Sequence, residues 1–222
     1  MAISFISNLM YLLPTSVRSI KFDKNIWSSV LTNANQLVLD IRNEEGTDID
    51  IITLDIDSLV GESIPIEPIN KWMKLIGIKN HQLYFIRYLD TNDPSSNDFL
   101  MFDPGKQLLE PVTQLPHFTE PAVYAQIYEH GSEYFKTVAE FLGLELPLSC
   151  EYLEWNDKII ISYYLRSDNG FDRYLLLLRD GMKEWKIKQD ESMKGFSSGA
   201  FFVVGDQLIF IKDRNEVCVY AD

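Results

Sequence analysis

Long apolar runs, cysteine, histidine and positive charge are all scarce in this sequence, and each shortage excludes a class of protein. No run of about 18 uninterrupted apolar residues occurs, so no membrane-spanning helix is expected. The 33 acidic residues outnumber the 20 basic ones, and the basic residues are scattered along the chain. The resulting net charge of -13 repels polyanions, so neither nucleic acid nor an anionic membrane surface is expected as a partner.

The two cysteines, Cys150 and Cys218, lie in apolar, strand-like text. We expect buried free thiols in a cytoplasmic protein, with a disulfide or a reactive thiol as the alternative. The opening segment, MAISFISNLMYLLPTSVRSI, has no basic residue near its start and is interrupted by Ser4, Ser7 and Asn8. It is therefore expected to be mature structure rather than an export signal.

The composition that remains is that of a globular protein. A chain of 222 residues with 46% hydrophobic content can bury roughly 70% of the surface that it exposes when unfolded. A single domain over residues 1–222 is predicted.

Four stretches of the chain share one pattern, in which a polar pair, an apolar run, a polar turn and a second apolar run follow one another. They are NQLVLDIRNEEGTDIDIITLDID, HQLYFIRYLDTNDPSSNDFLMFDPG, DKIIISYYLRSDNGFDRYLLLLRDG and DQLIFIKDRNEVCVYAD. The runs are rich in β-branched and aromatic residues, and the connectors are built from turn-forming residues, so each stretch predicts a β-hairpin. The flanking segments supply further strands to each unit.

The spacing of these hairpins predicts the fold. Their apolar runs begin at Leu37, Leu83, Ile159 and Leu208, at intervals of 46, 76 and 49 residues, and an insertion of 32 residues from Pro116 to Pro147 explains the long interval. A repeat of 40 to 50 residues with four strands is typical of a propeller blade. We predict an all-β, propeller-like ring of about four blades with a short helical insertion at about 116–147; the alternative is a β-sandwich.

The two ends of the chain complement each other. The last unit stops after its third strand, whereas the chain begins with an apolar segment outside any unit. We therefore expect this segment to pair with the last hairpin around Val217 to Tyr220 and so to protect an exposed sheet edge. The strand residues predicted at the start of the chain are Phe5, Ile6, Leu9 and Tyr11.

The insertion predicts two short helices. Thr119 can cap a first helix that ends near Gly131, and Ser132 can cap a second that ends at Gly143. On the first helix, Tyr124 and Tyr128 lie four residues apart, and we predict that these two tyrosines contact a partner. The alternative is that the helices only pack on their own domain.

Residues for catalysis, metal binding or nucleotide binding do not occur at informative spacings. The three histidines, His81, His117 and His130, form no metal-binding motif, and the acidic loop from Asp90 to Asp98 lacks the glycine and terminal glutamate of a calcium loop. Ser197 and Ser198 precede a strand rather than a helix, unlike a hydrolase nucleophile. The carboxylate pairs Asp48 with Asp50 and Asp55 with Asp57 are expected to be solvated. No catalytic residue, cofactor or metal is predicted.

The four tryptophans remain as candidates. At least three of Trp27, Trp72, Trp155 and Trp185 are expected to pack between sheets, and the alternative is an exposed platform for a ligand.

Two resemblances accompany these patterns. The phrase DRYLLLLRDGMKEW is similar to the end of a blade in quinoprotein-type propeller repeats, although the cofactor residues of those enzymes have no counterpart. The order IWSSV, FDPG, PAVY, SEYFKTVAEFL, SYYL and KGFSSGAFFV resembles, over nearly the whole chain, a domain-of-unknown-function family with propeller-like repeats found in Bacteroidetes. This resemblance implies a stand-alone bacterial protein and no particular activity.

Together these features predict a non-catalytic binding or protein-interaction module. Its partner would be an unknown protein or a small ligand, and the protein would be a monomer or a weak oligomer. The alternative is a hydrolase or lyase with a carboxylate-lined site in the central channel.

Overall fold

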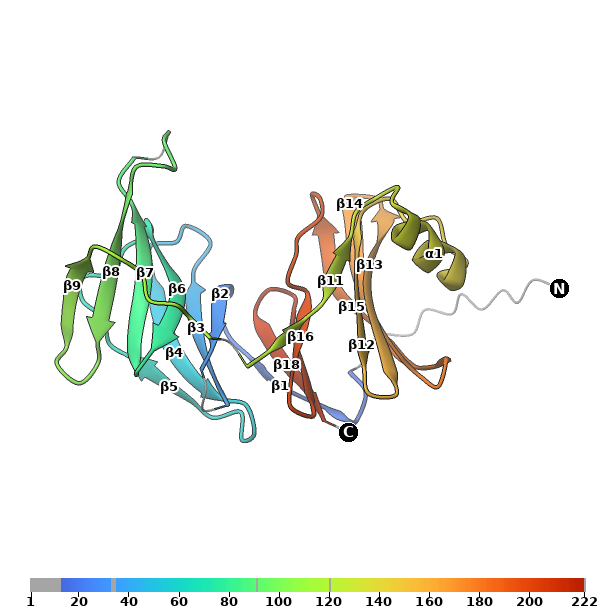
Figure 1. Ribbon diagram of the computed structural model, residues 1–222, viewed down its shortest axis with the longest axis horizontal. Coiled ribbons are helices and arrows are strands. Elements are labelled where there is room, and N and C mark those ends of the chain that lie inside the picture. The colour runs from blue at the N-terminus through green and yellow to red at the C-terminus, as the bar shows by residue number, and fades with distance from the viewer. Residues whose placement is uncertain (1–12, 33–34, 91, 120, 222) are drawn as a thin grey trace. The chain divides into compact units, whose positions relative to one another are not determined.

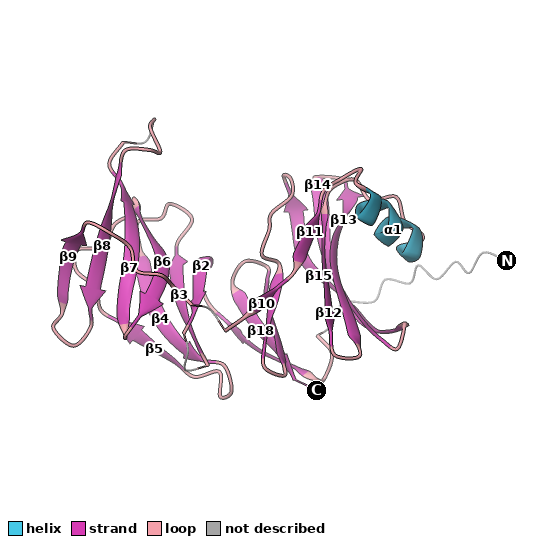
Figure 2. Cartoon of the chain, in the orientation of Figure 1, coloured by secondary structure: helices cyan, strands magenta, loops and turns pink. Residues whose placement is uncertain are grey.

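The computed structural model describes residues 13–32, 35–90, 92–119 and 121–221. It shows an all-β protein: the described strands form four antiparallel sheets, accompanied by one α-helix (Figures 1 and 2). The contacts of the chain divide it into two compact units, residues 19–123 with 214–217 and residues 1–18 with 124–213 and 218–222. A single domain over residues 1–222 stays a prediction, and the units are described separately below.

The unit built on residues 19–123 contains two four-stranded meanders. Their strands are β2 (Asn25–Leu31), β3 (Gln36–Arg42), β4 (Ile49–Asp55), β5 (Gly61–Ile64), β6 (Met73–Lys79), β7 (Gln82–Tyr88), β8 (Asn97–Asp103) and β9 (Leu108–Val112). The two hairpins predicted here, β3–β4 and β7–β8, are confirmed. Both sheets contribute to one core, in which Val38 of β3 and Ile51 of β4 join Leu75 of β6 and Phe85 of β7.

The other unit contains a five-stranded meander that is apolar on both faces. Its strands are β11 (Gln126–Tyr128), β12 (Cys150–Trp155), β13 (Lys158–Ser167), β14 (Gly170–Arg179) and β15 (Met182–Met193). Because side chains alternate across a strand, Leu175 and Leu177 enter one core, and Leu176 and Leu178 enter a second core on the opposite face. The apolar LLLL run is therefore explained by a sheet that is covered on both sides.

The fourth sheet joins the two ends of the described chain. Its order is β1 (Val17–Lys21), β18 (Glu216–Ala221), β17 (Gln207–Lys212), β16 (Phe201–Val204) and β10 (Val123–Tyr124). The strand beside the last hairpin is therefore β1, which follows the segment for which this pairing was predicted, and the Ser19 hydroxyl donates a hydrogen bond of 2.6 Å to Glu216. The residues expected to make this strand, Phe5, Ile6, Leu9 and Tyr11, lie outside the described residues.

The insertion contains one helix rather than two. The second predicted helix is confirmed as α1 (Glu133–Leu142), capped by Ser132 and Gly143. The first is wrong, because the segment after Pro121 forms the short strands β10 and β11 instead. The β-branched and aromatic residues of this segment form edge strands: β10 lies at the edge of one sheet, and β11 pairs with β12 at the edge of another. This strand pairing overrides the helix-start signal at Thr119.

A buried ion pair connects the two sheets of the unit at residues 19–123. Asp40 and Arg42 lie on the same face of β3 and are both almost completely buried. The guanidinium group donates two hydrogen bonds of 2.6 Å to the Asp40 carboxylate. It also donates to the backbone carbonyl of Lys71, at 3.1 Å, and to that of Met73. Because Met73 begins β6, this one side chain ties β3 to the neighbouring sheet.

Removal of the arginine alone should destabilise the protein strongly. Arg42→Met leaves the Asp40 carboxylate buried without its counter-charge, which typically costs about 3–5 kcal/mol of unfolding free energy. The double variant D40L/R42M should be more stable than R42M, because no unpaired charge remains. Chemical denaturation of the three proteins measures the difference; a double variant no more stable than R42M would show that the ion pair does not make this connection.

Candidate functional site

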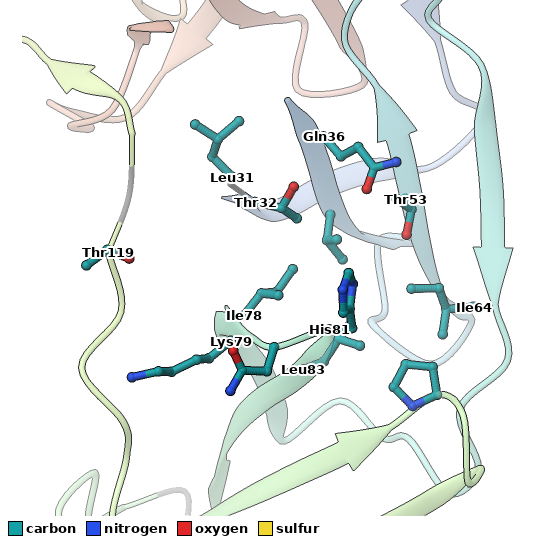
Figure 3. Close-up of a pocket in the computed structure, with 13 residues that line it drawn as sticks. Leu31, Thr32, Gln36, Thr53, Ile64, Ile78, Lys79, His81, Leu83 and Thr119 are labelled. Carbon is teal, nitrogen blue, oxygen red and sulfur yellow. The ribbon is translucent and has the colours of Figure 1, made fainter. Parts of the chain in front are cut away.

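A cavity of about 470 Å³ lies between the β2–β5 sheet and the β6–β9 sheet. Its lining includes the ends of β2 and β6 (Figure 3). The lining residues are Leu31, Thr32, Gln36, Val38, Thr53, Ile64, Ile78, Lys79, Asn80, His81, Leu83, Pro104 and Thr119. Its volume falls within the range of about 300–1,000 Å³ that is usual for small-molecule sites.

The lining combines apolar walls with a few polar groups. Val38 and Leu83 belong to the buried core, and Ile64 of β5 is packed against that core. Among the polar groups, Gln36 and Thr53 come from neighbouring strands of one sheet, and His81 faces them from the β6–β7 turn (Figure 3). Apolar walls with a small number of oriented polar groups are typical of ligand sites.

The tight turn between β6 and β7 places His81. Lys79 pairs with Gln82 across the hairpin, so only Asn80 and His81 remain for the loop. Both have positive φ angles, 51° and 65°, as a two-residue type I′ turn requires. Glycine is the usual residue at the second of these positions, and histidine occupies it here at a cost in backbone strain. The imidazole is thereby held at the cavity.

The segment around Phe118 forms the remaining wall. The Phe118 ring covers the Cα of Gly77 in β6 and packs edge-on against Tyr84, with ring centroids 5.4 Å apart. Lys79 donates a hydrogen bond of 3.2 Å to the His117 carbonyl. These contacts hold Thr119 at the cavity, and Figure 3 shows Lys79 extending toward the chain segment that carries Thr119.

The charge of the lining is the reverse of the charge of the chain. The whole sequence carries a formal charge of -13. In the cavity, however, Lys79 and His81 are the ionisable residues among the described residues of the lining, and no described aspartate or glutamate belongs to it. The cavity is therefore a locally cationic or neutral site in an acidic protein.

The two tyrosines predicted to contact a partner lie on different strands. Tyr124 belongs to β10, is 47% exposed and packs against Phe202, with ring centroids 5.7 Å apart. Tyr128 belongs to β11 and is half-buried. The expectation that they share one face of a helix is wrong, because the segment is not helical.

Tyr128 is the middle member of a stack of three tyrosines. Its ring lies 5.3 Å from that of Tyr134 on α1 and 5.5 Å from that of Tyr152 on β12. Tyr134, at the end of the stack, is 70% exposed. Along α1, Phe135 and Val138 are buried, whereas Tyr134 and Phe141 are exposed.

We call the exposed part of this region the insertion surface: Tyr134, Phe141 and Leu144, with the half-buried Tyr128 stacked on Tyr134. Acidic side chains surround it in the sequence, namely the exposed Glu129, Glu133, Glu140, Glu145 and Glu154. The pKa of Tyr152 is raised to about 12 by burial and by its 2.8 Å hydrogen bond to Glu154. The pKa of Tyr128 is also raised, mainly by burial and in part by Tyr134 and Glu154.

The remaining candidates from the sequence fall into structural roles. Asp93 accepts hydrogen bonds from Ser95 within the acidic loop, and Asp98 pairs with Arg87 on β7. Within the described residues, no group of three or more His, Cys, Asp or Glu side chains is arranged to hold a metal ion. Both cysteines are buried free thiols, and burial raises the pKa of Cys150 to about 11.

Ser197 and Ser198 lie on an exposed loop that buried polar groups hold in place. The Tyr164 hydroxyl accepts a hydrogen bond from the Ser197 amide, at 3.0 Å, and donates to the Ser197 carbonyl, at 3.1 Å. The buried Glu151 carboxylate accepts from the Gly199 and Ala200 amides. Burial raises the pKa of Glu151, and the two amides partly oppose this shift.

The tryptophans divide evenly between the core and the surface. Trp155 and Trp185 are buried in one core, whereas Trp27 is 48% exposed and Trp72 is 42% exposed. The expectation that at least three pack inside is wrong. Trp27 covers the buried Arg42 guanidinium, 5.0 Å from its ring centroid, and Lys71 lies over Trp72 at the same distance.

Comparison of the chain with protein-family models and with curated proteins gives no match. In the parts of the chain that the structure describes, no helix is long and apolar enough to cross a membrane.

The wall formed by Phe118 can be tested at Gly77. In Gly77→Ala, the added methyl group would overlap the Phe118 ring, so the ring and the 117–119 segment must move. Overpacking of this kind costs about 1–3 kcal/mol. Gly195→Ala is the control, because nothing lies within 4 Å of the position that its methyl group would take. We expect a lower melting temperature for Gly77→Ala alone, and equal melting of the two variants would contradict the observed packing.

Proposed function

We propose that this protein is a non-catalytic interaction module that binds a protein partner through the insertion surface. The stack formed by Tyr134, Tyr128 and Tyr152 is the observation that carries this proposal. A tyrosine that is largely exposed yet held in place by stacked neighbours loses little side-chain entropy when a partner buries it. Phe141, one heptad after Tyr134, extends the same apolar stripe along α1.

The charge around this surface supports a basic partner. From residue 128 to residue 154, five glutamates but only one lysine, Lys136, are exposed. The next lysine in the sequence, Lys158, is buried, so the exposed charge of this region is mainly negative. Acidic groups around an apolar centre favour partners that carry lysine or arginine and disfavour acidic ones. The partner that fits is a protein segment with apolar side chains flanked by basic residues, and Tyr124 on the neighbouring strand β10 remains a proposed contact.

The proposal is tested by capture of partners from a cell extract on wild-type and variant protein. Tyr134→Ala should weaken capture of the specific partner at least tenfold, about 1.4 kcal/mol, and change the melting temperature by no more than about a degree or two. Met182→Ala is the matched control, because Met182 is 73% exposed but lies on β15 outside the insertion surface. Equal capture by the two variants would place the interface elsewhere.

A charge reversal tests the basic character of the partner. Glu140→Lys puts a positive charge in the last turn of α1, where the helix dipole favours it, and this gain offsets the repulsion from Lys136 one turn earlier. The fold should therefore keep its stability while binding weakens, and wild-type binding should fall as salt is raised. A partner that binds Glu140→Lys as well as wild type, or binds independently of salt, would contradict the charge argument.

We also propose that the four sheets are blades of a propeller-like ring in a cytoplasmic protein. The β2–β5 and β6–β9 sheets are four-stranded meanders, and the β11–β15 sheet contains a four-stranded meander, β12–β15. In the remaining sheet, β1 from near the start of the chain lies beside β18. These features support the ring. The buried free cysteines support a reducing compartment. An experimental structure of the full chain tests the ring: sheets related by an approximate rotation axis are expected, whereas two face-packed sheets would establish the β-sandwich alternative.

A further inference from the structure

We propose that the cavity between the β2–β5 and β6–β9 sheets binds a small amphipathic anion, of the class of medium-chain monocarboxylates. This site is separate from the insertion surface, and the inference goes beyond the interaction function proposed above. It depends on three properties of the cavity: its size, the distribution of its polar groups and the sign of its charge.

The size sets the class of molecule. Liquid water occupies about 30 Å³ per molecule, so a cavity of about 470 Å³ has room for on the order of 15 water-sized groups. A chain of about eight carbon atoms with a carboxylate head fits such a space.

The lysine of the lining is placed at one side of the cavity, whereas the uncharged Gln36 and Thr53 lie on the side of Ile64 (Figure 3). Val38, Ile64 and Leu83 offer surface for an alkyl chain. Lys79 and Thr119 lie together at the opposite side from Ile64 in Figure 3, with His81 between them and that wall. An occupant with an anionic end and an alkyl chain can place its charge near Lys79 and its chain along these apolar side chains.

The sign of the charge selects an anion. Lys79 uses one hydrogen bond on the His117 carbonyl, and an ammonium group has three donors. Among the lining residues that the structure describes, no carboxylate competes for it, whereas Lys24, Lys158 and Lys188 each form an ion pair with an aspartate or a glutamate. A carboxylate head at Lys79 would gain a charge-assisted hydrogen bond.

The strained turn supports a functional role for His81. Non-glycine residues with positive φ are retained where the surrounding structure or function requires them. His81→Gly should remove the imidazole while it relieves this strain, so the variant keeps its fold. Arg214→Gly is the matched control. Asp213 and Arg214 also have positive φ angles, so this variant places glycine at the second such residue of another turn. Arg214 is not a lining residue of the cavity.

The experiment measures binding of three eight-carbon probes, octanoate, octanol and octylammonium, to the full chain by isothermal titration calorimetry and by protein-observed NMR. Octanoate should bind most tightly, with shifts confined to the cavity residues. Lys79→Gln should weaken octanoate at least fivefold and leave octanol unchanged, and His81→Gly should weaken octanoate while Arg214→Gly does not. Thr53→Phe, which places a ring in the cavity on a strand that favours aromatic residues, should weaken both probes.

Each contrary result overturns the inference. Octylammonium binding as tightly as octanoate would exclude the anion, and no binding of any probe at millimolar concentration would exclude a ligand of this class. Shifts centred outside the cavity would assign binding to another surface. Melting temperatures of all four variants accompany the titrations, so that a loss of fold in Thr53→Phe is distinguished from a loss of binding in the folded Lys79→Gln protein.

Discussion

The need to satisfy a buried arginine fixes the arrangement of strands in both units of this protein. Arg42 is withdrawn from water; Asp40 matches its charge, and two further donors bind carbonyls at the start of the neighbouring sheet. In the other unit, the buried Arg173 pairs with Asp190 and reaches the Ser197 carbonyl at 3.4 Å. Because a guanidinium group has fixed geometry, each arginine permits only a narrow range of positions for the elements it joins. The cavity lies at the other end of β2 and β6 and depends on that fixed spacing.

The strands and hairpins could be predicted because their signals are local. The apolar runs that begin at Leu37 and Leu83, the connectors of turn-forming residues that follow them, and the LLLL run from Leu175 to Leu178 each constrain a few neighbouring residues in sequence. The helix α1 was equally predictable, because Ser132 and Gly143 cap it at both ends. None of these signals specifies which sheets pack together.

The parts that sequence could not supply depend on contacts between distant segments. The cavity draws residues from positions 31 to 119, and no pattern within one strand indicates that Gln36 and His81 will face each other. The segment after Thr119 carried a helix-start signal, but the open edges of two sheets recruited it as strands. Trp27 is partly exposed because its ring covers the buried Arg42 guanidinium group. The two residues are 15 positions apart in sequence, so no local pattern indicates this contact.

The sheet that contains both β1 and β18 has a consequence for how the protein is synthesised. Ser19 and Glu216 are hydrogen-bonded although they are 197 positions apart in the chain. At a translation rate of about 5–20 residues per second, the ribosome needs roughly 10–40 s to produce the partner strand after β1 has been made. During that interval β1 has no strand of its own sheet to pair with, so the nascent chain carries an unsatisfied strand edge that chaperones or transient pairing must protect.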